Sequence, residues 1–124
     1  MIEEDVKTLP LSGELDVRTQ AAASARIAEA LDESPRFLVL DLRDVDFLGS
    51  AGLSVLIETQ RAAAARDISV GLIANRRATM LPLELTGLTT MFPVFASPEE
   101  AARSARAQRQ QAGVVPGIGA HMRQ

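Results

Sequence analysis

The sequence predicts an α/β fold with a mostly parallel sheet covered by helices, and two observations support this prediction. Short apolar runs alternate along the chain with longer stretches whose apolar residues recur every three or four positions. The run FLVLDL at Phe37–Leu42 is apolar at nearly every position, as expected of a strand that is buried on both faces of a parallel sheet. Strands that alternate with helices pack as a parallel sheet with helices on its faces.

Length and composition predict one domain with a small aliphatic core. The 124 residues are enough for a single core and too few for two. Hydrophobic residues make up 47% of the chain and aromatic residues only 3%, so the core must consist of Leu, Val, Ile and Ala. We expect residues 1–110 to form the domain and residues 111–124, which are rich in small residues, to form a flexible C-terminal tail.

Charge and residue usage exclude several classes of protein. The net charge is −3 and no basic stripe is present, so direct nucleic-acid binding is not expected. The chain has no cysteine, which excludes disulfides and thiolate metal sites, and we expect no metal or cofactor. No run approaches the roughly 18 apolar residues of a membrane span, and the acidic N-terminus is unlike a signal peptide. We therefore expect a cytoplasmic protein that does not contact a membrane.

The first predicted elements are a strand, a turn and a helix. The strand covers Val6–Leu11, where Pro10 is typical of an edge strand or a strand end. A polar turn is expected at Ser12–Asp16. The helix runs from about Thr19 to Leu31 and ends before Pro35, because the residue preceding a proline disfavours the helical conformation. Its buried face is expected to comprise Ala23, Ile27, Ala30 and Leu31.

The second half of the chain predicts a strand, then a short helix. The strand is Ile68–Ala74. Asn75 is placed to cap a helix that ends at Leu85, with Gly87 as a left-handed C′ residue. Pro82 should either kink this helix or mark its true first turn.

The last predicted elements are a strand at Met91–Phe95 and a helix that fades near Gln110. Pro98 suits the first position of this helix, and the two acidic residues after it complement the helix dipole. The arginines of this helix can form a solvated face or a basic patch for an acidic partner; they are Arg103, Arg106 and Arg109.

The centre of the chain, Val45–Arg66, predicts a short loop followed by a helix. The loop Gly49–Gly52 consists of small residues, and Ser50 falls where a serine commonly caps the start of a helix. In α/β sheets, ligand and modification sites lie where a strand ends in such a turn and a helix begins. The expected buried face of the helix comprises Leu53, Leu56, Ile57 and Ala64.

Three segments in this order resemble a STAS domain, and more closely the small single-domain anti-sigma factor antagonists of bacteria. They are LSGELD at Leu11–Asp16, VLDLRDVDFLGSAGL at Val39–Leu53, and LTGL at Leu85–Leu88. The resemblance covers residues 6–108. It implies a STAS-type single domain with a small, mostly parallel mixed sheet of four to five strands, packed by about four helices.

The family's loop motif reads aspartate, serine, a small residue, glycine and an aliphatic residue, and its serine is the phosphorylation site. Ser50 matches that serine, while Gly49 replaces the aspartate. The resemblance also places the loop with Glu14 and Asp16 beside the partner surface. The partner-binding residues expected on these grounds are Glu14, Asp16, Gly49, Ser50, Ala51, Gly52 and Ser54.

The resemblance implies a partner switch that regulates transcription. The unphosphorylated antagonist binds an anti-sigma factor that is itself a GHKL-type serine kinase, and the sigma factor is released. Phosphorylation of the antagonist breaks that complex, and a PP2C-type phosphatase restores it. The alternative is a non-phosphorylated STAS interaction or scaffold module in a signalling assembly, in which Gly49 has disabled the switch.

Other interpretations of these residues are structural or catalytic. Ser50 can cap the helix, accept a phosphate, or do both, and Ser54 suits a solvated helix face. Asp41, Asp44 and Asp46 suggest a metal or receiver site, but the only lysine is Lys7 on the first strand, so we expect them to cap the strand end.

An enzyme is not expected. Ser50 would need a base, and the only histidine is His121 in the predicted tail. The sequence GSAG also lacks the spacing of a nucleophile elbow.

Overall fold

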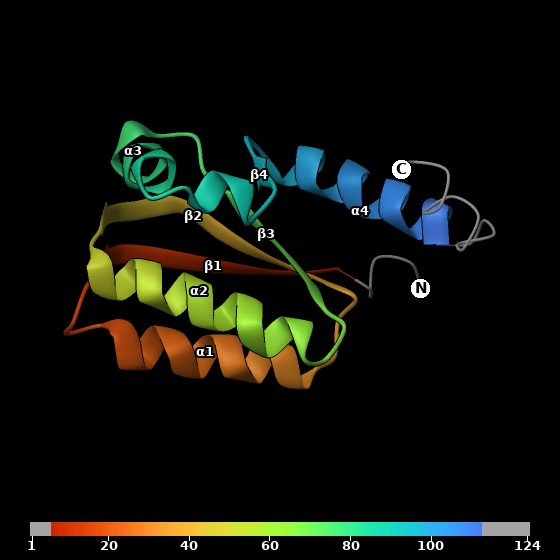
Figure 1. Cartoon of the computed structure of the whole chain (residues 1–124), viewed down its shortest axis with the longest axis horizontal. Helices are drawn as coiled ribbons and strands as arrows, with labels where there is room; N and C mark the ends of the chain where they lie inside the picture. Colours follow the sequence, from red (N-terminus) through yellow and green to blue (C-terminus); the bar gives the residue numbers. More distant parts are fainter. Residues whose placement is uncertain (1–5, 113–124) are drawn as a thin grey trace.

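The predicted α/β architecture is confirmed by the computed structural model, which describes residues 6–112 and the side chains of residues 6–107 (Figure 1). Strands and helices alternate along this part of the chain. The elements are β1 (Val6–Leu15), α1 (Gln20–Asp32), β2 (Phe37–Leu48), α2 (Ser50–Ala64), β3 (Ser69–Ile73), α3 (Arg77–Leu85), the 3₁₀ helix η2 (Leu88–Thr90), β4 (Val94–Phe95) and α4 (Pro98–Ala112).

The four strands of the described residues form one sheet in the order β1-β2-β3-β4, and each neighbouring pair is parallel. Helices α1 and α2 lie side by side on one face, and α4 lies on the other (Figure 1). β1 is an edge strand, so Pro10 lies at an edge as predicted. Because the strands are parallel, the turns after β1 and β2 meet at the same end of the sheet.

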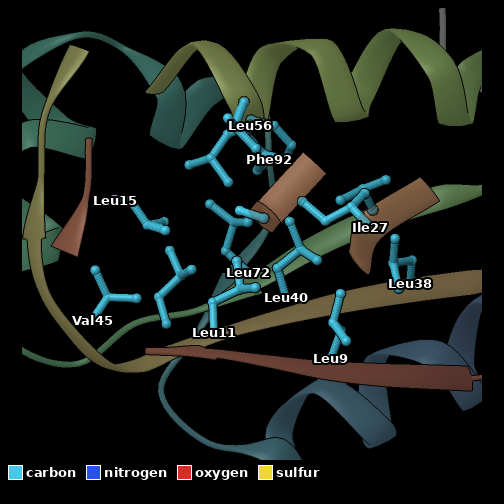
Figure 2. Close-up of a cluster of buried hydrophobic side chains, with 14 of the residues drawn as sticks. Leu9, Leu11, Leu15, Ile27, Leu38, Leu40, Val45, Leu56, Leu72 and Phe92 are labelled. Carbon is cyan, nitrogen blue, oxygen red and sulfur yellow. The ribbon is translucent and has the colours of Figure 1, made fainter. Parts of the chain in front are cut away.

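Each face of the sheet has its own apolar cluster. On the face of α1 and α2, leucines of β1 and β2 pack with Ile27, Leu56 and Leu72 (Figure 2). On the opposite face, Ala101 and Ala105 of α4 cover an aromatic and β-branched set: Phe37, Val39, Ile73 and Phe95. The two rings of that set pack edge to face, with centroids 6.3 Å apart.

β1 and β2 are longer than predicted, because β-bulges interrupt their regular pattern. The strand ends expected at Leu11 and Leu42 lie at Leu15 and Leu48, and the predicted turn at Ser12–Asp16 is mostly strand. The register between the strands shifts twice, and Gly13 adopts a φ of +77° near the second shift. Beyond Leu42 the buried residues of β2 are three apart, so the two-residue period of a strand is lost.

Helix α1 lies within one residue of its predicted bounds, with Thr19 at the N-cap and the expected face buried. The buried face predicted for α2 is partly wrong. Leu56 is buried, Leu53 and Ile57 are half-buried, and Ala64 is exposed. The buried set is rotated towards α1 and consists of Gly52, Val55, Leu56, Thr59 and Ala63.

The predicted cap of α3 is wrong, whereas its predicted end is confirmed. Arg76 is the N-cap, and the Asn75 side chain instead donates a hydrogen bond to the carbonyl oxygen of Ala96 at 3.1 Å. Pro82 lies inside α3, so it does not mark the first turn. Gly87 follows the C-cap with a φ of +79°, the left-handed conformation expected at C′.

The C-terminal helix begins at Pro98 as predicted. Ser97 Oγ accepts a hydrogen bond from the Glu100 N–H at 3.2 Å, and Glu100 Oε1 accepts one from the Ala96 N–H at 2.6 Å. These reciprocal bonds resemble a capping box. β4 is shorter than the predicted Met91–Phe95, because the preceding residues form η2 and a turn.

The predicted flexible tail lies outside the described residues from residue 113 onward, and His121 lies there too. Arg103 and Arg106 are exposed on α4, whereas the side chain of Arg109 is not among those described. Within residues 6–112, no helix is long and apolar enough to cross a membrane.

Candidate functional site

The candidate site lies where β1 and β2 end and α2 begins. The N–H of Gly49 donates to the carbonyl oxygen of Leu15 at 3.1 Å, and the Leu53 N–H donates to the carbonyl oxygen of Gly49 at 2.9 Å. These bonds tie the start of α2 to the end of β1. The end of β1 that carries Glu14, with Asp16 directly after it, is thereby brought beside the start of α2 that carries Ser50.

Gly52 permits the close approach between α2 and β1. A Cβ atom at this position would lie 2.8 Å from each of three atoms: the Leu15 Cβ, the Leu15 carbonyl oxygen and the Leu48 Cδ1. Gly52 is also buried. The structure therefore gives this glycine of the motif a packing role, below the surface that a partner could reach.

Ser50 is not the N-cap of α2, and this part of the sequence prediction is wrong. Gly49 is the N-cap, with φ −89° and ψ −174°, and Ser50 is the first residue of the helix. Because the N-cap residue is a glycine, no side chain caps this helix start. Ser50 is exposed, and the first N–H groups of a helix have no partner within the helix. An exposed hydroxyl thus stands at the positive end of the helix dipole.

The other motif residues around Ser50 differ in exposure. Ser54 is exposed one helical turn after Ser50, so the two serines lie on the same side of α2. Gly49 and Ala51 are half-buried. The accessible part of the predicted set on α2 is therefore Ser50 and Ser54, with Gly49 and Ala51 at its margin.

Glu14 and Asp16 form an ion-paired turn. Arg18 donates through one guanidinium nitrogen to Glu14 Oε1 at 2.7 Å and to Asp16 Oδ2 at 3.0 Å. Asp16 Oδ1 also accepts from the N–H groups of Arg18 at 3.0 Å and Thr19 at 3.3 Å. Although desolvation acts in the opposite direction, the hydrogen bonds and charge of Arg18 lower the pKa of Asp16.

Thr19 completes this turn. Its hydroxyl donates to the carbonyl oxygen of Glu14 at 2.6 Å and accepts from the Asp16 N–H at 3.0 Å. Sequence reasoning did not include Arg18 or Thr19 in the site. The aspartate three residues before Thr19 is a typical signal of such a turn and could have indicated them.

The three aspartates of β2 do not form a metal site. Asp41 is buried, and its carboxylate accepts three hydrogen bonds from the Arg43 side chain, at 2.9, 3.2 and 2.8 Å. Its Oδ1 also accepts from the Arg43 N–H at 3.1 Å, next to a register shift. Asp46 pairs with Arg76 at 3.4 Å. Within residues 6–112, no cluster of three or more ligating side chains could hold a metal ion.

Asp41 binds Arg43 within β2 and Asp46 pairs with Arg76 at the start of α3, whereas the sequence predicted that the aspartates cap the strand end and turn. Asp41 and Asp46 are interior residues of the longer strand. The hydrogen bond from Arg43 is the main reason that the pKa of Asp41 lies below its usual range.

Two exposed apolar residues beside the site were not predicted. The side chain of Phe47 is 51% exposed at the end of β2, and that of Val17 is 76% exposed in the turn after β1. The Phe47 ring lies over Gly49: its Cε2 and Cζ atoms are 2.8 and 3.2 Å from the position that a Cβ would occupy there. An aromatic residue three positions before Ser50, in a chain with few aromatics, is the signal that could have indicated it.

Comparisons with known proteins agree with this fold. The sequence model of the STAS domain matches residues 2–101. The chain is 35% identical to the anti-sigma-F factor antagonist RsfB of Mycobacterium tuberculosis over 104 residues, which is 84% of each chain.

Solved structures of other proteins superpose on this fold. A crystal structure of an anti-sigma factor antagonist from Mycobacterium paratuberculosis superposes with a TM-score of 0.77 at 35% identity, over 83% of this chain and 87% of that one. The unphosphorylated form of the anti-sigma factor antagonist SpoIIAA superposes with a TM-score of 0.71 over 86% and 93% of the two chains, and at 20% identity it supports the fold alone. The domain match over most of the chain, with which the parallel sheet agrees, shows that this chain belongs to the STAS domain family.

Proposed function

We propose that this chain is an anti-sigma factor antagonist that is switched by phosphorylation of Ser50. In its unphosphorylated form it binds an anti-sigma factor, a GHKL-type serine kinase, in the cytoplasm and releases a sigma factor. It has no catalytic activity of its own. The observation that carries this proposal is the position of Ser50, an exposed hydroxyl at the start of α2 with no side-chain cap beside it.

The transfer requires a free serine hydroxyl on the antagonist. The Ser50 Oγ attacks the γ-phosphorus of ATP on the kinase, an O–P bond forms, and the bond to the bridging oxygen breaks to leave ADP. The hydroxyl proton passes to a base on the kinase. An uncapped and exposed Ser50 needs no rearrangement of α2 to present this oxygen.

The phosphorylated form is expected to keep its fold and lose its partner. A phosphate adds about −1.5 to −2 charges. Free N–H groups and the dipole at the start of α2 favour that charge within the domain. At a docked surface, the same group is bulky and must lose its hydration, so the complex dissociates. A PP2C-type phosphatase would restore binding.

The test is phosphorylation by purified GHKL-type anti-sigma factors from the organism that encodes the chain, followed by intact mass measurement. The wild-type chain should gain one phosphoryl group with ATP, and so should the control variant Ser54→Ala. Ser50→Ala should gain none. Transfer to Ser50→Ala, or loss of transfer in Ser54→Ala alone, would contradict Ser50 as the acceptor.

Binding measurements on the same variants test the switch itself. Ser50→Ala should bind the anti-sigma factor as the wild type does, while Ser50→Asp and the phosphorylated chain should bind more weakly. Because the Ser50 hydroxyl makes no capping bond, Ser50→Ala should change the free energy of unfolding by less than about 0.5 kcal/mol. Equal affinities of the wild-type, Ser50→Asp and phosphorylated chains for the anti-sigma factor would contradict a phosphorylation switch.

The second candidate function is a STAS interaction module without a phosphorylation switch. Gly49, which stands where the family motif has an aspartate, favours this candidate, because no carboxylate is present to orient the serine or contact a kinase. A wild-type chain that binds an anti-sigma factor and gains no phosphate from it would support this candidate.

A further inference from the structure

Phe47 differs in its surroundings from the other aromatic residues of the chain. The sequence contains four phenylalanines and no other aromatic residue. Phe37, Phe92 and Phe95 are buried, with at most 9% of each exposed, whereas Phe47 is 51% exposed. An exposed aromatic ring loses the stabilisation that its burial would give. Packing in the core therefore does not explain why a phenylalanine stands at this position.

The Phe47 ring lies beside Ser50 because Gly49 has no side chain to occupy that space. Two ring atoms lie 2.8 and 3.2 Å from the Cβ position of Gly49, so the ring occupies the volume of the missing side chain. The backbone of Gly49 has a negative φ of −89°, which any residue adopts. The glycine at position 49 therefore leaves room for the Phe47 ring, and the backbone conformation at this position does not require a glycine.

The charges on this side of Ser50 are already paired. In the register of β1 and β2, Glu14 lies opposite Phe47. Its carboxylate is bound by Arg18, which also binds Asp16. Val17, between these acidic and basic groups, is 76% exposed. The surface next to Ser50 therefore offers an aromatic ring and an internally paired ionic turn.

We propose that Phe47, held over Gly49, is a specificity-determining contact that inserts into an apolar pocket of the anti-sigma factor. This inference rests on the proposed function. The ring shares its surface with Ser50, so a partner that docks over the serine also covers the ring. Aromatic anchors in partner pockets carry a large part of binding energy, and a strongly contributing anchor is worth about 30-fold in affinity.

A pocket that accepts the ring would discriminate against a charge at residue 49. An aspartate there must displace the ring and would place a carboxylate against an apolar surface, which costs free energy unless it is hydrogen-bonded. The pair Phe47 and Gly49 would thus direct this chain to a partner with an apolar pocket, and away from a partner that binds a carboxylate at this position.

The test uses the full chain and the purified anti-sigma factor that the wild-type chain binds, with affinity measured by calorimetry. Phe47→Ala should lower the affinity by about 30-fold. The matched control is Leu85→Ala, which truncates an exposed apolar side chain on α3 and should leave affinity within about twofold of wild type. Both variants change exposed positions, so their melting temperatures should stay close to that of the wild type.

A double-mutant cycle tests the link between the two residues. Gly49→Asp should weaken binding in the wild-type background and have a much smaller effect in the Phe47→Ala background, because the ring it displaces is already absent. Additive effects of the two substitutions would overturn the pairing. Phe47→Leu, which keeps an apolar side chain, should bind better than Phe47→Ala if the pocket is apolar.

The inference is wrong if Phe47→Ala binds as tightly as the wild type, or if Leu85→Ala loses as much affinity. In either case the wild-type chain still binds the anti-sigma factor, so the proposed function survives. If the wild-type chain binds no anti-sigma factor, the proposed function fails, and this inference fails with it. The two failures are therefore distinguishable.

Discussion

Gly49 is the N-cap of α2 and Gly52 lies in its first turn, and different neighbours occupy the space beside each of them. The space beside Gly52 is taken by the backbone and side chain of Leu15 and by Leu48, whereas the space beside Gly49 is taken by one half-exposed ring. A backbone oxygen cannot yield to a new methyl group without moving a strand. A ring at the surface can rotate away.

This difference predicts unequal effects of two alanine substitutions. Gly52→Ala should lower the free energy of unfolding by about 1–3 kcal/mol through overpacking. The control Gly49→Ala should cost less than about 1 kcal/mol, because only the Phe47 ring must move. Urea denaturation of both variants measures the difference, and equal costs would contradict the packing role of Gly52.

Asp41 predicts a stability effect that depends on pH. The Arg43 hydrogen bonds lower its pKa in the folded state, so its contribution is fully present above the unfolded pKa of about 3.9. The contribution is lost as the pH falls through the lower, folded pKa. Asp41→Asn should therefore reduce the free energy of unfolding at pH 7 by about 1–3 kcal/mol, and the reduction should shrink towards pH 3.

Urea titrations at pH 7 and pH 3 test this prediction, with the neighbouring exposed Asp44→Asn as the control. Asp44→Asn should have little effect at either pH. A cost of Asp41→Asn that is the same at both pH values would show that the carboxylate charge is not what stabilises the strand.

At the scale of single elements, the helices α2 and α4 start in different ways. α4 has a reciprocal cap from Ser97 and Glu100, whereas α2 begins without a side-chain cap. An uncapped start leaves N–H groups free for another anion, such as a phosphate. At the start of α4, the Ser97 hydroxyl accepts a hydrogen bond from the Glu100 N–H, so this N–H already has a partner within the chain.

The cap of α4 is expected to stabilise the fold. Ser97→Ala should lower the free energy of unfolding by about 1 kcal/mol, because an N–H in the first turn of α4 loses its acceptor. Ser24→Ala, an exposed serine inside α1, is the control and should be neutral or slightly stabilising, since alanine favours a helix. Thermal and urea denaturation measure both, and equal effects would contradict a capping role for Ser97.

At the scale of the whole molecule, α4 completes the second core. Ala101 and Ala105 cover Phe37 and Phe95 on the sheet face opposite α1 and α2. The STAS match also ends within α4, at residue 101.

Deleting residues 113–124 should leave the melting temperature nearly unchanged, because this short segment with three glycines has only four larger apolar side chains to bury. The control deletion begins at Pro98 and removes Ala101 and Ala105. It should lower the melting temperature by about 4–8 °C for each kcal/mol of stability lost. A fall of the melting temperature by more than about 4 °C on deletion of residues 113–124 alone would show that this segment packs against the domain.

The sequence by itself determined the features that depend on neighbours in the chain. Thr19 and Pro35 bracket α1, Gly87 ends the turn after α3, and Pro98 begins α4, because caps and fixed backbone angles act within a few residues. The apolar run from Phe37 indicated the central strand, since two-sided burial leaves few polar positions. The short motif around Ser50 indicated the family for the same reason: its residues are contiguous.

Tertiary contacts decided the features that depend on residues far apart in the chain. The bulges that extend β1 and β2 arise from their mutual pairing, and they replace the two-residue period by which a strand is recognised. Packing of α2 against α1 rotates its buried face towards Thr59 and Ala63. Only the folded chain brings the Leu15 carbonyl oxygen to the Gly49 N–H, because Leu15 lies more than thirty residues earlier in the sequence. This contact accompanies a helix start in which Gly49, and not Ser50, is the N-cap.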